Sequence, residues 1–137
     1  MKRKKRRHKH NTALLREKIW NLMSKVKRLL FADHRGMVLC VTCGTEHHWK
    51  EIDAGHYVPK SLGTAARFDW FNFWPQCTYC NHVLQGNGYK YGRWVEDTMG
   101  SDERIRLEQL SGKVTKLYTA GYLEMLEFWE QCYDEVV

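Results

Sequence analysis

The clearest hydrophobic pattern lies near the N-terminus, where apolar residues recur at steps of three and four. That period places them on one stripe of an α-helix, which Asn11 or Thr12 can cap and which Gly36 ends. Basic residues fall mostly outside the stripe. We therefore predict an amphipathic basic helix within residues 12–35, reaching to about Ala32. The stripe consists of Leu14, Leu15, Ile19, Leu22, Met23, Val26, Leu29 and Leu30.

Between residues 36 and 100 the pattern breaks into short runs, which we expect to form the core. Residues 37–59 are typical of short strands around a Cys-x-x-Cys-Gly turn, and residues 61–76 of an irregular loop with aromatic anchors. A second Cys-x-x-Cys turn then leads into a helix that begins near Thr78 or Asn81 and that glycines interrupt. A further helix follows, from near residue 89 to residue 99.

The C-terminal part, residues 101–137, is predicted to be helical. Ser101 can cap a short helix, because its hydroxyl can accept a hydrogen bond from the first turn. The last helix begins at Thr119. Its expected buried positions are Tyr122, Leu123, Leu126, Phe128 or Trp129, and Tyr133. The whole pattern predicts an α+β fold, with a single domain over residues 12–137.

Composition indicates a globular intracellular protein. The chain has 137 residues, of which 43% are hydrophobic, so it can bury a core without disulfides. No apolar run approaches the ~18–20 residues of a membrane span, and the basic N-terminus lacks the short apolar segment of a signal peptide. We therefore expect a reducing compartment, where paired cysteines more often hold metal than form disulfides.

Charge is unevenly distributed along the chain. Residues 1–35 carry 13 lysines and arginines against two acids, whereas the remainder carries nine against 14 acids. A basic arm on a mildly acidic body is typical of proteins that bind nucleic acid, although a solubilising tail or a membrane-surface patch has the same composition. We expect residues 1–11 to be a disordered arm that contacts DNA. Its proposed DNA-binding residues are Lys2, Arg3, Lys4, Lys5, Arg6 and Arg7.

Four of the five cysteines form two Cys-x-x-Cys pairs, Cys40 with Cys43 and Cys77 with Cys80. Two residues between cysteines let both thiolates of one turn point at one ion, and two such turns complete a tetrahedral site that suits Zn²⁺. Four thiolates leave no open coordination position, so this zinc is expected to be structural. The alternative is a pair of unrelated buried turns. Cys132 has no partner in this pattern and is expected to be an ordinary core residue.

The two cysteine turns are separated by 33 residues, more than the ~15–20 of an ordinary zinc ribbon. The enclosed segment and its border offer residues that suit phosphodiester hydrolysis, which needs a base for water and a hard cation for the phosphate. His56 suits the base, because an unperturbed imidazole (pKa ~6.5) is neutral at cellular pH. Asp53 and Asn81 offer oxygen ligands to Mg²⁺. Asn72 can orient the strand that carries His56.

The order of these motifs resembles a known family. The stretches "CVTCG", "DAGHY", "RF…N…PQC..CN" and "GN…Y" are similar to the NinG/Rap family of phage recombination nucleases, in the HNH group with the ββα-metal fold. The resemblance spans roughly residues 12–135. It implies a small ββα-metal core, stapled by a four-cysteine zinc site and flanked by N- and C-terminal helices. It also implies a Mg²⁺- or Mn²⁺-dependent nuclease in the cytoplasm of the bacterial host, cutting branched recombination intermediates such as Holliday junctions and D-loops.

Position by position, the resemblance makes His56 the general base, Asn72 the middle residue of the HNH pattern, and Asn81 a metal ligand in place of the final histidine. One departure concerns the acidic ligand. Many HNH nucleases carry it directly before the base, where this chain has Gly55, and the nearest acid is Asp53. Residues 53 and 56 face opposite sides of a regular strand, so Asp53 is expected to bind metal only if the strand bends or bulges at Gly55.

Each candidate also has a purely structural interpretation. A histidine at a strand end can simply be hydrogen-bonded, and Asn72 can close a turn on its own backbone. Asn81 can cap a helix, in which case His82 replaces it as ligand. Three further cations, Lys60, Arg67 and Arg93, can hold phosphates or lie on the surface as solvated charges. The aromatic residues Trp70, Phe71, Phe73 and Trp74 are expected to be core, with stacking on DNA as the alternative.

Three functions therefore remain open from the sequence. The first is a metal-dependent, structure-specific DNA endonuclease for branched DNA, for which cutting both strands of a junction would favour a homodimer. The second is a non-catalytic zinc module that binds DNA and recruits other recombination proteins. The third is a sequence-specific HNH homing or restriction endonuclease.

Overall fold

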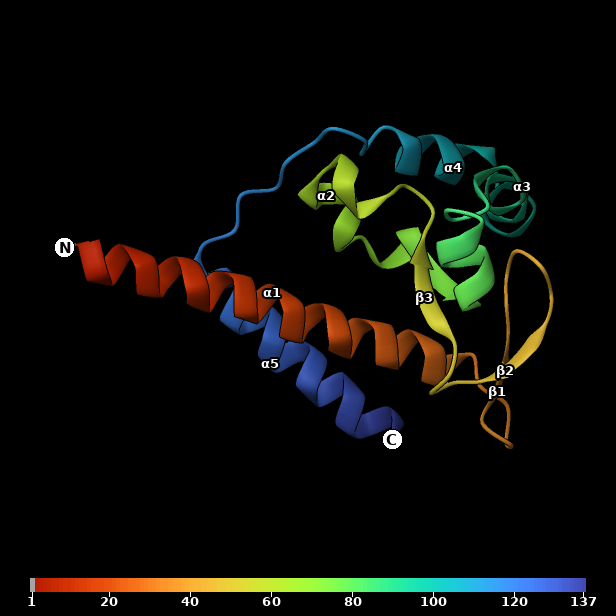
Figure 1. Cartoon of the computed structure of the whole chain (residues 1–137), viewed down its shortest axis with the longest axis horizontal. Helices are drawn as coiled ribbons and strands as arrows, with labels where there is room; N and C mark the ends of the chain where they lie inside the picture. The colour runs from red at the N-terminus through yellow and green to blue at the C-terminus, as the bar shows by residue number, and fades with distance from the viewer. Residues whose placement is uncertain (1) are drawn as a thin grey trace. The chain divides into compact units, whose positions relative to one another are not determined.

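The computed structural model describes residues 2–137, with side chains from Thr12 onward (Figure 1). The chain divides into two compact units, one made of Met1–Val26 with Lys116–Val137 and the other of Lys27–Thr115. The predicted disordered arm, with its side chains Lys2 to Arg7, lies outside the described side chains. Both that prediction and the single domain over 12–137 stay predictions. Among the described residues, no helix is long and apolar enough to cross a membrane.

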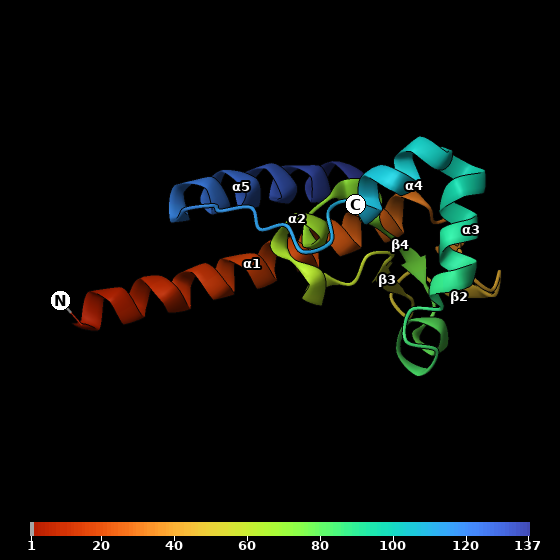
Figure 2. The same ribbon diagram turned by 90° about the horizontal axis from the view of Figure 1, so that it is seen from above.

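The first unit pairs two helices. Helix α1 (Lys2–Leu30) contributes its part up to Val26, and α5 (Thr119–Val136) runs beside it in the same direction (Figures 1 and 2). The Arg16 guanidinium lies 6.0 Å from the ring centroid of Tyr122, and the Lys25 ammonium lies 5.7 Å from that of Tyr133. Two basic residues of α1 therefore make cation–π contacts with tyrosine rings of α5.

The start of α5 at Thr119 and the burial of Tyr122 are as predicted. The predicted burial of Leu123 is wrong, because this residue is more than half exposed. Of the alternatives Phe128 and Trp129, Phe128 is exposed and Trp129 is half-buried. A regular stripe predicts which residues can share one helix face. It does not fix how wide a face the neighbouring helix covers.

The second unit begins with a short hairpin. Strands β1 (Met37–Leu39) and β2 (Glu46–His48) pair antiparallel, with Met37 opposite His48. The first cysteine turn connects them, and Gly44 adopts the positive φ of 76° that this turn requires. The hairpin thus presents the first cysteine pair at its tip.

A second antiparallel pair forms the centre of this unit. Strand β3 (Asp53–His56) pairs residue for residue with β4 (Phe73–Gln76). The prediction of an irregular loop over 61–76 is wrong, because this segment contains short helical turns and then strand β4. Short helical segments η1 (Lys60–Leu62), α2 (Thr64–Arg67) and η2 (Trp70–Asn72) precede the strand. All four residues of β4 are buried, so it shows no polar alternation, and Pro75 is a residue that strands rarely hold.

Helices complete the unit after β4. Cys77 directly follows β4, and Cys80 lies in the π-helical turn η3 (Tyr79–Val83). Helix α3 (Gly88–Met99) comes next, and α4 (Ser101–Glu108) packs beside α3 (Figure 2). The predicted helix near Thr78 is limited to this one turn. It stops where Gln85 and Asn87 take positive φ angles of 52° and 48°. The apolar centre consists of Val58, Ala66, Trp74, Tyr91, Val95 and Leu107.

The predicted cap of α4 is wrong. Gly100 occupies the cap position, and the Ser101 hydroxyl donates to the Glu96 carboxylate at 2.5 Å instead of capping its own helix. Gly100 can take the φ of 92° that the sharp α3–α4 connection needs. Gly100 is therefore the N-cap residue of α4, because the connection from α3 to α4 needs its positive φ angle.

Gly55 lies where helix α3 and strand β4 both approach β3. The Tyr91 hydroxyl donates to the Gly55 carbonyl at 2.6 Å. A Cβ placed on Gly55 would overlap Oε1 of the fully buried Gln76. This chain therefore has no room for a side chain at the position directly before His56.

We predict that Gly55→Ala lowers the free energy of unfolding by about 1–3 kcal/mol, because the buried Gln76 side chain must move. Gly88→Ala is the matched control. A Cβ there meets nothing within 4 Å and lies on a helix, so its effect should stay within ~1 kcal/mol in the stabilising direction. Denaturant unfolding of the zinc-loaded protein measures both. Equal midpoints for the two variants would contradict the tight packing at Gly55.

Candidate metal centre and active site

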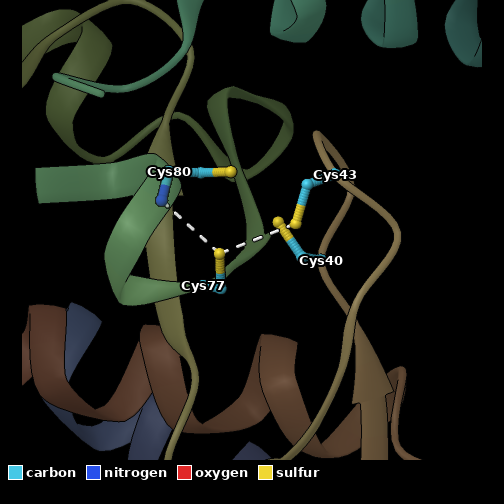
Figure 3. A group of neighbouring side chains, drawn as sticks. All are labelled: Cys40, Cys43, Cys77 and Cys80. Carbon is cyan, nitrogen blue, oxygen red and sulfur yellow. Dashed lines mark hydrogen bonds between the residues drawn. The ribbon is translucent and has the colours of Figure 1, made fainter. Parts of the chain in front are cut away.

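The four paired cysteines come together as the sequence predicts (Figure 3). Their sulfur atoms all lie within 4.8 Å of one another, and the Sγ atoms of Cys43 and Cys77 are 3.7 Å apart. A tetrahedral zinc with ~2.3 Å bonds to sulfur places its ligands about 3.8 Å apart. The four cysteines could therefore hold a metal ion such as zinc, with Cys40 and Cys80 buried and Cys43 exposed at the rim.

Hydrogen-bonding groups lie beside the sulfurs of Cys40 and Cys77. The Cys80 N–H donates to Cys77 Sγ at 3.4 Å, and the Thr42 hydroxyl lies 3.3 Å from Cys40 Sγ. Burial opposes ionisation of Cys40, but hydrogen bonds from the Cys77 backbone and from Thr42 outweigh it and lower the pKa of Cys40 to about 6. Burial raises the pKa of Cys77 to about 12. Four thiolates this close require a cation, so the donor set fits Zn²⁺.

Asn72 is the residue that fixes the histidine loop. Its side chain is fully buried. Its Oδ1 accepts from the Val58 N–H at 2.9 Å, and its Nδ2 donates to the carbonyls of Val58 at 2.9 Å and Ala66 at 2.8 Å. These three bonds tie η2 to the chain just after β3 and to helix α2. The contacts are those expected of a residue that orients the strand carrying His56, not of a turn closed on its own backbone.

His56 ends strand β3 with its ring held by a backbone carbonyl. Nε2 lies 2.9 Å from the Arg67 carbonyl oxygen, which can only accept, so Nε2 carries the proton and the neutral ring keeps its lone pair on Nδ1. Burial lowers the pKa of His56 to about 4; the Arg67 carbonyl opposes this, and the charges of Lys60 and Arg67 add to it. The imidazole is therefore neutral at physiological pH and can accept a proton at Nδ1.

Two of the three proposed phosphate contacts lie near this ring. Lys60 and Arg67 are close enough to lower the proton affinity of His56, so both bring positive charge to it. Within the part of the chain that the structure describes, the buried Nε of Arg67 has no hydrogen-bond partner. Arg93 is exposed on α3, and its guanidinium lies 5.7 Å from the ring of Tyr89. A neutral base flanked by two cations suits a phosphate substrate.

A second group of polar residues joins β3 to the second cysteine turn, residues 77–81. Asn81 Nδ2 donates to Asp53 Oδ2 at 3.3 Å, and His82 Nε2 lies 3.3 Å from the same oxygen. The turn itself holds Asn81 in place, because its N–H donates to the Cys77 carbonyl at 2.9 Å. Asn81 lies inside η3, so the alternative that it caps a helix is wrong. Asp53 and His82 are accessible to solvent, with 35% and 68% of their side chains exposed.

The sequence made metal binding by Asp53 conditional on a bend or bulge at Gly55, and the structure shows a regular strand there. Strand β3 pairs one to one with β4, with Asp53 opposite Gln76 and His56 opposite Phe73. Alternation puts Asp53 on the same face as Gly55, the position of the acidic residue in many HNH nucleases, and His56 on the other face. The structure therefore makes two groups, His56 with Lys60 and Arg67, and Asp53 with Asn81 and His82. About 10 Å of strand separates their β3 members.

Sequence reasoning missed three buried polar residues that support these groups. Gln76 Nε2 donates to the Gly86 carbonyl at 2.8 Å and so ties β4 to the loop after η3. Tyr91 holds the Gly55 carbonyl, and Lys27 holds that of Trp70. Lys27 had a signal in the sequence: it continues the four-residue step from Ile19 to Met23. Because lysine is charged, the sequence did not predict that Lys27 shares the buried face of α1 with Ile19 and Met23.

We predict that Asn72→Ala lowers the free energy of unfolding by about 2–4 kcal/mol, because it leaves the buried amide and carbonyl groups of Val58 and Ala66 unpaired. Asn21→Ala, at an exposed position of α1, should change it by less than ~1 kcal/mol. Chemical denaturation with zinc content checked in parallel measures both variants. An Asn72→Ala protein as stable as the Asn21→Ala control would contradict the clamp.

His56 should make stability depend on pH. Between pH ~4 and ~6.5 the unfolded histidine binds a proton that the folded one does not, so stability rises with pH through this window and falls on acidification. Replacing it by glutamine should flatten this dependence by about 1–2 kcal/mol after allowance for partial exposure. The exposed His34→Gln serves as control and should keep the slope of the unmodified protein. Denaturation midpoints from pH 5 to 7, at constant zinc content, measure it; an unchanged slope in His56→Gln would contradict the buried neutral ring.

Comparison with known proteins gives one match. A family model described as "Bacteriophage Lambda NinG protein" matches residues 1–120. No curated protein and no solved structure matches the chain. The match takes in both cysteine turns, the histidine strand and Asn72, and it confirms the resemblance that the motifs indicated. The chain therefore belongs to the bacteriophage lambda NinG protein family.

Proposed function

We propose that this protein is a divalent-metal-dependent DNA endonuclease that cuts branched recombination intermediates, such as Holliday junctions and D-loops. One observation carries the chemistry: a neutral imidazole is fixed at Nε2 by the Arg67 carbonyl, inside a loop clamped by Asn72. The branched substrate comes from the family resemblance. His56, Asn72 and Asn81 occur in the HNH order, and the contacts of His56 and Asn72 support the roles proposed for them.

In this proposal His56 is the general base. Its Nδ1 takes a proton from the attacking water, and the Arg67 carbonyl stabilises the resulting imidazolium through its hydrogen bond from Nε2. A pKa near 4 makes the ring a weak base, but it leaves almost every molecule unprotonated and ready to accept a proton at neutral pH. Lys60 and Arg67 hold the phosphate and offset its negative charge.

Asp53, Asn81 and His82 are the residues that would hold the catalytic cation. A carboxylate and an amide oxygen suit Mg²⁺, and an imidazole nitrogen makes the set also acceptable to Mn²⁺. The amide of Asn81 has to turn its oxygen toward the ion, away from its present hydrogen bond to Asp53. Bound there, the cation would supply positive charge for a phosphate of the DNA backbone that passes this face of β3.

The placement of the two groups sets a demand on the substrate. His56 and Asp53 face opposite sides of β3, so one stretch of DNA backbone has to reach both. A linear duplex holds its phosphates on a regular helix, whereas the backbone at a branch point turns sharply between neighbouring phosphates. This demand favours branched over linear DNA. The basic N-terminal arm adds affinity that does not depend on sequence, and about seven phosphate contacts would give a salt slope of about −6.

The test is cleavage of a panel of four-way junction, D-loop, flap and linear duplex, with Mg²⁺, with Mn²⁺ and with EDTA. We expect metal-dependent cutting of the branched substrates. His56→Ala should lower the rate by roughly 100-fold or more, because it removes the base. Zinc content and junction binding should persist, since neither uses the imidazole. His34→Ala is the matched control and should cut like the unmodified protein.

Each other outcome would contradict part of this proposal. Cutting by His56→Ala at the control rate would remove the histidine from the chemistry. Junction binding without cleavage under any metal would point to a non-catalytic zinc module that recruits other recombination proteins. Cleavage of linear duplex at one defined sequence would point to a homing or restriction type of endonuclease.

A further inference from the structure

Lys27 is a charged residue buried inside the second unit. Its side chain is fully buried, and Nζ donates to the Trp70 carbonyl at 2.6 Å. Three aromatic rings surround the ammonium: Nζ lies 3.7 Å from the ring centroid of Trp74, 3.8 Å from that of Trp70 and 4.9 Å from that of Phe73. These three rings and the carbonyl form what we call the lysine cage.

The lysine cage explains how the charge is tolerated. Burial disfavours an ammonium and lowers the pKa of Lys27 to about 7, while the nearby Asp69 carboxylate opposes that shift. Ring faces and a carbonyl oxygen both favour the protonated form. A methionine would fill a similar volume without a donor and without strain. A lysine at this position therefore contributes a hydrogen-bond donor and a charge in addition to the volume that it fills.

What Lys27 holds is the start of η2. Trp70 is the first residue of this segment, and Asn72 is the last. The other side of the same segment is fixed by Asp69, whose Oδ1 accepts from the Phe71 N–H at 3.1 Å. Arg106 binds the Asp69 carboxylate through two bonds of 2.8 and 3.0 Å. The segment that carries Asn72 is thus held by one cation on each side.

From Asn72 the contacts lead to the catalytic ring. Asn72 Nδ2 donates to the Ala66 carbonyl. The next carbonyl along the chain, that of Arg67, accepts from His56 Nε2. A shift of η2 would therefore move the Ala66–Arg67 peptide and change the hydrogen bond that holds the imidazole.

We infer that Lys27 is a positioning residue: its caged ammonium fixes the Trp70 carbonyl, and through the Asn72 clamp it sets the hydrogen bond between the Arg67 carbonyl and the imidazole of His56. The catalytic consequence rests on the proposed function. The positional claim does not, so the two can fail separately.

The test uses the zinc-loaded full chain without DNA. NMR titration gives the pKa of His56, with the His56→Gln spectrum used to assign its signal. Lys27→Met should raise this pKa by about one unit or more toward the ordinary value, because the ring loses its fixed, partly buried position. Lys18→Met, an exposed lysine of α1, is the charge control. Val95→Ala creates a cavity at a fully buried position of α3 and controls for general loosening.

The expected pattern is a shift in Lys27→Met alone. An unchanged His56 pKa in folded Lys27→Met would overturn the inference, and so would an equal shift in Val95→Ala. If Lys27→Met does not fold, Trp70→Leu replaces it. That variant removes one ring of the lysine cage, keeps the carbonyl and should shift the pKa in the same direction; no shift overturns the inference.

Cleavage gives a separate readout. In Lys27→Met we expect the rate at saturating four-way junction to fall about tenfold, with the half-saturating DNA concentration unchanged, because the lysine cage contacts the loop and not the DNA. A raised half-saturating concentration at full rate would place Lys27 in DNA binding and overturn the positioning role. If the unmodified protein cuts no substrate with any metal, the proposed function fails while the titration still decides the positional claim.

Discussion

The structure depends on the approach of four sulfur atoms from two turns that lie 33 residues apart in the sequence. Closing so long a segment costs conformational entropy, and the two strand pairs it joins are only three and four residues long. A metal ion shared by the four thiolates would supply the required binding energy directly to folding. The enclosed segment can then fold against a fixed frame. It contains β3, the loop after it, α2, η2 and β4.

Inside this frame, polar contacts converge on one backbone stretch. Asn72 binds the chain after β3 and the end of α2, and Lys27 and Asp69 hold the segment that carries Asn72. The result is a half-buried, neutral imidazole at the end of a short strand. Such an arrangement keeps a histidine unprotonated over a wide pH range. It also limits the strength of the base, so the charges of Lys60 and Arg67 beside the ring would have to stabilise the transition state.

The sequence predicted the features that spacing alone determines. Two Cys-x-x-Cys pairs gave the cysteine cluster, and the sequence singled out Asn72, which the structure buries in hydrogen bonds with Val58 and Ala66. Its role as an orienting residue stays a prediction. Features that depend on three-dimensional packing were missed. Strand β4 carries no alternation because both of its faces are buried.

The sequence left open whether β3 bends or bulges at Gly55, since glycine allows either. In the structure the strand is regular, and the missing side chain at Gly55 makes room for that of Gln76. Asp53 contacts Asn81 of the second cysteine turn from this regular strand. Lys27 is a second case in which packing could not be predicted from the sequence. Its charge predicted an exposed side chain, whereas three aromatic rings and a carbonyl stabilise the ammonium in a buried site.

The most direct measurement of the central claim is the single-turnover rate of junction cleavage as a function of pH, compared with the NMR titration of His56 in the same zinc-loaded protein. If His56 is the base, the rate should stay nearly level from pH ~7 down to about 5.5, and its acid limb should follow the measured pKa of that ring, near 4. An acid limb at about pH 6.5 or above, while the ring titrates near 4, would contradict the assignment.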